Sequence, residues 1–210
     1  MVLSILKEKE STFFSPEEKF WTWFLQNDEN LFNFERNQEK VFDMLAYELS
    51  QVHPDLTFEF GPVLENTKRE FVISAGGIKK AFPAVENLYN SSPKIEKWII
   101  TKFRPRREPL HSEMSFGNRT FKMEDIFFKL YEDNQKVGIQ IFIKDFTQDE
   151  YEIFAQIGYL YLDSALGEYD LETKVGFVEF LGIDSEYFLK ARKIDNLSSD
   201  FNEVYKKVQK

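Results

Sequence analysis

The segment from Phe146 to Gly167 carries the clearest helical pattern in this sequence. Its apolar residues recur at spacings of three and four, which places them on one helix face: Ile153, Phe154, Ile157, Leu160, Tyr161 and Ala165. Thr147 and Glu150 have the spacing of a capping box, and Phe146 and Tyr151 that of a hydrophobic staple. Gly167 suits a left-handed helix end. Because strand-like segments flank this helix, we expect it to pack on a sheet.

Alternating or compact apolar runs predict six strands elsewhere in the chain. They cover residues 56–60, 69–75, 98–103, 126–131, 137–143 and 172–181. The order strand, strand, helix, strand occurs in residues 56–103 and again in 126–181, without residue-by-residue identity between the two stretches. This order favours an α+β fold with a mainly antiparallel sheet of about six strands, arranged as one sheet or two small ones, with helices on one face.

Helical segments precede and follow these strands. After an irregular start over residues 1–14, Ser15 and Pro16 open a helix, and a second helix is expected over 35–52. We predict one α+β domain over residues 1–210. Its parts are a helical N-terminal part (1–54), a sheet-and-helix body (55–181) and a helical tail (182–210).

Charge and composition exclude several classes of function. The formal net charge is −9, which argues against general nucleic-acid binding and suits a basic protein partner. The chain has no cysteine, so disulfides, thiol nucleophiles and cysteine-ligated metals are excluded. No apolar run approaches the roughly 18 residues of a membrane span, and the N-terminus lacks a signal-peptide core. We therefore expect a soluble cytoplasmic protein that binds no membrane.

The polar segment 104–120 is too long for a simple connection and holds the main candidate site. Its candidate ligand-binding residues are Arg104, Arg106, Arg107, His111 and Glu113. Guanidinium groups suit carboxylate or phosphate oxygens, so a small anionic ligand is one interpretation. The other is that the arginines pair with the protein's own acidic residues on an exposed loop. His111 and Glu113 could act as a general base and its hydrogen-bond partner, or as two metal ligands. A single His-x-Glu pair is a weak signal for either role.

Three further features have both a functional and a plain structural interpretation. Three acidic residues lie near the end of the 146–167 helix: Asp163, Glu168 and Asp170. They could catalyse proton transfer or bind a cation, or they could form an ordinary solvated surface. Gly76-Gly77 follows a strand, as in a phosphate-binding turn, but a tight turn explains it as well. Trp23 shares a helix side with Phe20 and Phe24, which core packing explains, and Trp21 lies on another side. Trp21 is a candidate for a partner-binding patch if it is exposed, but burial is the expected state of so large an apolar side chain.

No familiar catalytic motif is present. The sequence contains no P-loop, G-x-G-x-x-G, G-x-S-x-G or H-E-x-x-H pattern. We predict no metal ion and no cofactor, and identify no catalytic residue. The leading hypothesis is a non-catalytic interaction protein with a basic protein partner; the alternative is an enzyme or sensor for a small anionic ligand bound by the Arg104–Glu113 segment.

Overall fold

The computed structural model describes residues 14–117 and 119–210. The irregular start predicted for the first residues lies outside this range up to residue 13. The α-helices of the described chain are α1 (Pro16–Gln26), α2 (Asp28–Phe32), α3 (Gln38–Val52), α4 (Phe82–Asn90), α5 (Tyr151–Leu166), α6 (Glu168–Lys174) and α7 (Leu197–Val208). The strands are β1 (Thr57–Val63), β2 (Arg69–Ser74), β3 (Trp98–Lys102), β4 (Glu113–Phe116), β5 (Arg119–Lys122), β6 (Ile126–Asp133), β7 (Lys136–Ile143), β8 (Val175–Gly182) and β9 (Arg192–Lys193). The α+β class and the N-terminal helices are confirmed.

The strands form three small sheets: the six predicted strands divide between two of them, and β4 and β5 form a third. Both larger sheets mix parallel and antiparallel pairs, which corrects the expected mainly antiparallel sheet. The strand orders are β1-β2-β3, β4-β5 and β8-β7-β6-β9. In the first sheet β1 and β2 are antiparallel and β3 returns parallel to β2 after α4. In the third, β6 and β7 are antiparallel and β8 returns parallel to β7 after α5 and α6. The same order of pairing therefore occurs twice.

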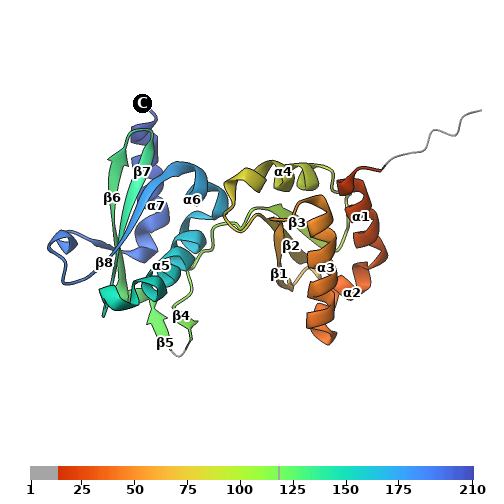
Figure 1. Cartoon of the computed structure of the whole chain (residues 1–210), viewed down its shortest axis with the longest axis horizontal. Helices are drawn as coiled ribbons and strands as arrows, with labels where there is room; N and C mark the ends of the chain where they lie inside the picture. The colour runs from red at the N-terminus through yellow and green to blue at the C-terminus, as the bar shows by residue number, and fades with distance from the viewer. Residues whose placement is uncertain (1–13, 118) are drawn as a thin grey trace, which may run out of the picture.

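Two separate clusters of buried apolar side chains explain why the strands do not join in one sheet. One cluster extends from Phe20 to Phe103 and lies between the N-terminal helices and the first sheet. The other extends from Phe121 to Phe201 and lies between the third sheet and α5 and α7. Each set of strands thus covers its apolar face with its own helices. Figure 1 shows the two parts side by side along the long axis of the molecule.

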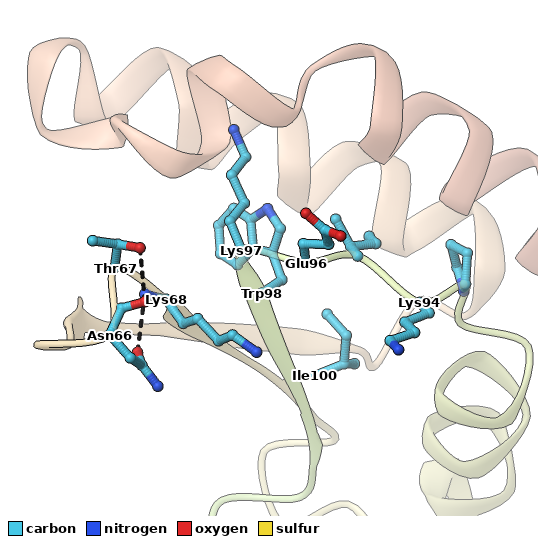
Figure 2. A pocket seen from close by; sticks show the side chains of 10 residues that line it. Asn66, Thr67, Lys68, Lys94, Glu96, Lys97, Trp98 and Ile100 are labelled. Atoms are coloured by element: carbon cyan, nitrogen blue, oxygen red, sulfur yellow. Dashed lines mark hydrogen bonds between the residues drawn. The ribbon is translucent and has the colours of Figure 1, made fainter.

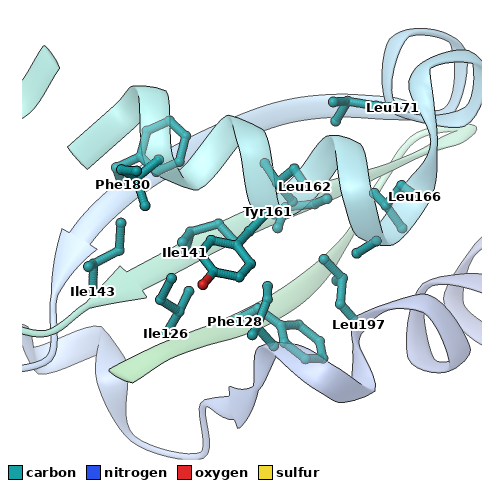
Figure 3. Packing of buried hydrophobic residues seen from close by; sticks show 14 of the residues in the cluster. Ile126, Phe128, Ile141, Ile143, Tyr161, Leu162, Leu166, Leu171, Phe180 and Leu197 are labelled. Atoms are coloured by element: carbon teal, nitrogen blue, oxygen red, sulfur yellow. The ribbon is translucent and has the colours of Figure 1, made fainter. Parts of the chain in front are cut away.

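Tyr161 lies inside the second cluster, where α5 packs on the strands. Figure 3 shows its ring among the side chains of Ile126, Phe128 and Ile141. Its hydroxyl donates to the backbone carbonyl of Phe121 at 3.3 Å, which satisfies a polar atom that would otherwise be buried without a partner. Burial, with a smaller contribution from the charge of Glu113, raises the pKa of Tyr161 to about 12.

The ends of α5 differ in how well the sequence predicts them. At the start, residues 148–150 form a short 3-10 turn, so the α-helix begins at Tyr151 and the Thr147 side chain caps no backbone N–H. The capping box is therefore wrong, although the rings of Phe146 and Tyr151 do lie in edge contact, 6.2 Å apart. At the end, Gly167 has φ of 74° and donates its N–H to Asp163, as predicted.

Two other details of this region correct the sequence interpretation. Leu160 is 47% exposed, because it lies beside the buried stripe of α5 rather than on it. Residues 172–174 belong to α6, so the strand predicted over 172–181 begins at Val175. The predicted tail over 182–210 contains α7 and also the two-residue strand β9, which pairs with β6. Among the described residues, no helix combines the length and apolar character that a membrane crossing requires.

Candidate functional site

The backbone of residues 104–107 runs along the C-terminal end of α5. The N–H of Arg107 donates to the carbonyl of Ser164 at 2.8 Å, and the N–H of Glu168 donates to the carbonyl of Arg104 at 2.9 Å. The start of the segment that the sequence indicates as a candidate site is therefore fixed between the two halves of the molecule.

Glu168 is fully buried at this junction. Its carboxylate accepts backbone N–H groups from Ala75 at 2.9 Å, Gly77 at 3.0 Å and Arg104 at 3.0 Å. Gly76 and Gly77 have φ of 59° and 80°, which is the left-handed region that glycine adopts without strain. The N–H groups of this turn thus bind the protein's own carboxylate, in the way that such turns bind phosphate in other proteins.

Arg104 joins the same junction through its side chain. Its guanidinium donates to both carboxylate oxygens of Asp163, at 2.7 and 3.0 Å, and to the hydroxyl of Ser74 at 2.8 Å. Burial disfavours the charged guanidinium, but the hydrogen bonds and charge of Asp163 outweigh it and the pKa of Arg104 is raised. This bidentate pair is a strong form of ion pair.

The other two arginines are also paired within the chain. Arg106 donates to the carbonyl of Leu166, to Asp170, to Ser198 and to Asn202, which ties α6 to α7. The guanidinium of Arg107 donates to Glu59 at 2.9 Å on β1. Asp163, Glu168 and Asp170, which the sequence marks as a carboxylate cluster, are thus the partners of the arginines at this junction.

His111 and Glu113 lie apart from these pairs. Both side chains are exposed, and Glu113 stands in β4 opposite Lys122 of β5. In the part of the chain that the structure describes, no three acidic or histidine side chains are grouped as a metal site would require. The structure brings the three arginines together but does not add His111 or Glu113 to them.

A cleft of about 380 Å³ adjoins Arg104 and Arg106, with Lys102 and Tyr169 also on its wall. Its arginines already have carboxylate partners, so an anionic ligand would have to displace them or share them. Ligand binding by the Arg104–Glu113 segment therefore stays a prediction. The contacts themselves are those of a structural junction.

Glu172 lies beside this junction, on α6. A Cβ at Gly77 would lie 3.2 Å from its carboxylate oxygen, so the two residues are close neighbours. Burial raises the pKa of Glu172, and the negative charge of Glu168 raises it further. The ionised form of Glu172 is thus disfavoured in the folded protein.

A second candidate site is a groove between α1 and α3, which we call the helical groove. It has a volume of about 220 Å³. Half of its lining residues are apolar and half are polar: Trp23, Leu31, Val41 and Met44, with Asn27, Asn30, Asn37 and Lys40. Figure 1 shows α1 and α3 side by side at one end of the molecule. Amphipathic segments of partner proteins commonly bind in grooves of this kind.

The structure decides between the two interpretations of Trp21 and corrects that of Trp23. Trp21 is only 3% exposed, and its indole N–H donates to the carbonyl of Leu88, so it belongs to the core. Trp23, which the sequence places in the core, is half-buried and lines the helical groove. Spacing alone does not separate the two, because the contact of Trp21 with Leu88 of α4 and the position of Trp23 at the groove beside α3 depend on distant segments.

Sequence reasoning did not identify Met44 as part of a site. Its one visible signal is that α3 carries Met44 and Tyr47 off the stripe of Val41, Leu45 and Leu49. That pattern marks exposed apolar residues but gives no partner for them.

In comparisons with protein-family models, with curated proteins and with solved structures, none matches this chain, so its function is inferred from the geometry of these sites.

Proposed function

We propose that this chain is a non-catalytic binding protein that holds a basic segment of a protein partner in the helical groove. The observation that carries the proposal is a groove with a partly apolar lining in an acidic part of the chain. Between residues 14 and 54 there are eight acidic residues and three basic ones, so this part holds five of the nine excess negative charges. Charge of one sign on a surface attracts partners of the other sign.

The side chains at the groove suit an apolar anchor. Met44, which lines the groove, is 37% exposed, and Tyr47, which lies one turn further along α3 and outside the lining, is 62% exposed. Methionine adapts its shape to different partners, and aromatic residues are enriched where binding energy concentrates. Asp43 and Glu48 each lie four residues from one of these two side chains, so carboxylates flank the apolar surface. Lysine or arginine residues beside an apolar anchor would complement this arrangement.

The test uses a defined probe: an amphipathic helical peptide of lysine and leucine, with a glutamate and leucine peptide of the same pattern as its counterpart. Titration of the full chain, followed by the fluorescence of a dye on the peptide, should show saturable binding of the basic peptide only. Met44→Gln should weaken binding at least about tenfold, because it replaces an apolar contact by an amide that loses its water on binding. Leu189→Gln, which changes a side chain 76% exposed outside the groove, should leave binding unchanged.

Three results would contradict the proposal: equal binding of the acidic peptide, no effect of Met44→Gln, or an equal loss in Leu189→Gln. Circular dichroism of each variant separates loss of binding from loss of folding. Because Met44 is already partly exposed, we expect its variant to fold.

A further inference from the structure

An open cleft of about 670 Å³ lies where β2 and β3 begin, apart from the helical groove. One wall is the turn Asn66–Lys68 before β2, and the other is the segment Pro93–Lys97 before β3. Trp98 and Ile100 of β3 complete the lining. The volume is in the range typical of small-molecule sites. We call it the lysine cleft, because Lys68, Lys94 and Lys97 all line it.

The two walls are held in place by the backbone. The parallel register sets Arg69 opposite Trp98, and the N–H of Arg69 donates to the carbonyl of Lys97 at 3.0 Å. Lys68 is therefore next to Lys97 in space, although 29 positions separate them in the sequence. The turn is closed by hydrogen bonds from the N–H of Leu64 to the carbonyl of Lys68 at 2.7 Å and from the N–H of Lys68 to the side-chain oxygen of Asn66 at 3.1 Å. Such a site needs little reorganisation to bind a ligand.

The three lysines differ in what they contact. Lys97 forms ion pairs with Asp28 at 2.9 Å and Glu29 at 3.1 Å, so its charge is already neutralised. Lys68 and Lys94 form no ion pair within the described residues, even though the chain has more acidic than basic residues. Figure 2 shows these two side chains extending from opposite walls toward β3, with Ile100 between their ends.

We propose that the lysine cleft binds a small phosphate monoester with an apolar body. Two ammonium groups match a group that carries −1.5 to −2 charges near neutral pH, and lysine is a common point-charge partner of phosphate. The amide N–H₂ of Asn66, on the same wall, can donate to a further phosphate oxygen. The half-buried Ile100 gives the body of the ligand an apolar surface. This site is independent of the helical groove and of the partner proposed there.

Glu96 also lines the lysine cleft, and its negative charge opposes the binding of an anion. Its exposed carboxylate lies between Lys94 and Lys97 in the chain and repels an anionic ligand. Removing this charge should therefore strengthen binding, whereas removing the charge of Lys68 or Lys94 should weaken it. Opposite shifts from neighbouring residues are difficult to produce by general destabilisation of the fold.

The experiment titrates the full chain with phenyl phosphate and follows backbone amide resonances by NMR. We expect saturable shifts concentrated in residues 66–68 and 94–100. Inorganic phosphate, which lacks the apolar ring, and phenol, which lacks the phosphate group, should each bind more weakly than phenyl phosphate. Lys68→Met and Lys94→Met should each weaken binding about fivefold or more, and Glu96→Gln should strengthen it about twofold. Lys206→Met, which removes an exposed charge on α7, should change nothing.

The proposal is overturned if the shifts do not saturate, if they spread over lysines outside the cleft, or if Lys206→Met weakens binding as much as Lys68→Met. It is also overturned if Lys68→Met and Lys94→Met bind phenyl phosphate as the unmodified chain does. Met44→Gln should leave phenyl phosphate binding intact, so failure at the helical groove and failure at the lysine cleft are distinguishable.

Discussion

The Glu168 carboxylate accepts the backbone N–H of Gly77 at 3.0 Å across 91 positions of sequence. The same carboxylate oxygen accepts the N–H of Ala75, and the other oxygen accepts that of Arg104. One buried side chain therefore joins the end of β2, the segment after β3 and the start of α6. Four predictions follow from this junction and from the packing of the sheets.

Glu168→Gln should lower the free energy of unfolding by about 2–3 kcal/mol, because hydrogen bonds to a charged group are lost and the amide N–H₂ faces a backbone donor. Urea denaturation measures the change. Glu186→Gln, at an exposed position, is the matched control and should stay within about 0.5 kcal/mol of the unmodified chain. A loss at Glu168 no larger than that of the control would show that the buried carboxylate contributes little to stability.

Glu172→Gln should stabilise the protein at neutral pH. The pKa of Glu172 is raised above its ordinary value of 4.5 by burial and by the charge of Glu168. The folded state then binds this proton more tightly than the unfolded state, so stability falls as pH rises from 4.5 through the folded-state pKa. Below pH 4.5 both states are protonated and the cost is absent.

The pH dependence of the Glu172→Gln effect is measured by thermal denaturation from pH 3.5 to 8. The variant should be more stable than the unmodified chain at the upper end, and this advantage should disappear at the lower end. An advantage that is constant over the whole range would mean that the effect does not come from ionisation of Glu172.

Gly158→Ala should destabilise the protein although alanine favours helices. A Cβ at Gly158 would lie 2.1 Å from the ring of Phe180 of β8, so the ring or α5 has to move. Overpacking costs about 1–3 kcal/mol, against about 1 kcal/mol gained in helix propensity. We expect a net loss of up to about 2 kcal/mol in chemical denaturation. Gln156→Ala, on the exposed face of the same helix, should show no loss; a more stable Gly158→Ala protein would contradict the close packing.

Arg106→Ala separates the structural and the ligand-binding interpretations of the arginine segment. Loss of its four acceptors should cost about 1–3 kcal/mol, because Asp170 keeps its charge without this partner. Arg36→Ala, at an exposed position, is the control. A thermal-shift series with nucleotides, sugar phosphates and carboxylates tests the alternative. A ligand that stabilises the unmodified chain but not Arg106→Ala would support a binding role for this segment.

Local patterns in the sequence determine most of the individual elements. The spacing of apolar residues predicts α5, and Gly167 predicts its end because a left-handed residue there has few alternatives. The hairpin of β6 and β7 is likewise visible from two short apolar runs separated by polar residues. These features depend on neighbours within a few positions, so the sequence by itself contains the information for them.

Contacts between distant segments decide the sites. Lys68 and Lys94 face the same cleft only because β3 pairs in parallel with β2, and strand pairing is set by which apolar faces are buried together. Trp21 is buried because it packs against the end of α4, where its indole N–H donates to the carbonyl of Leu88, whereas Trp23 lines the helical groove. The arginines that indicate an anion site in the sequence instead meet Asp163, Asp170 and Glu59 at the junction. Local propensity determines the elements, whereas burial and charge pairing over long separations determine which side chains remain free to bind.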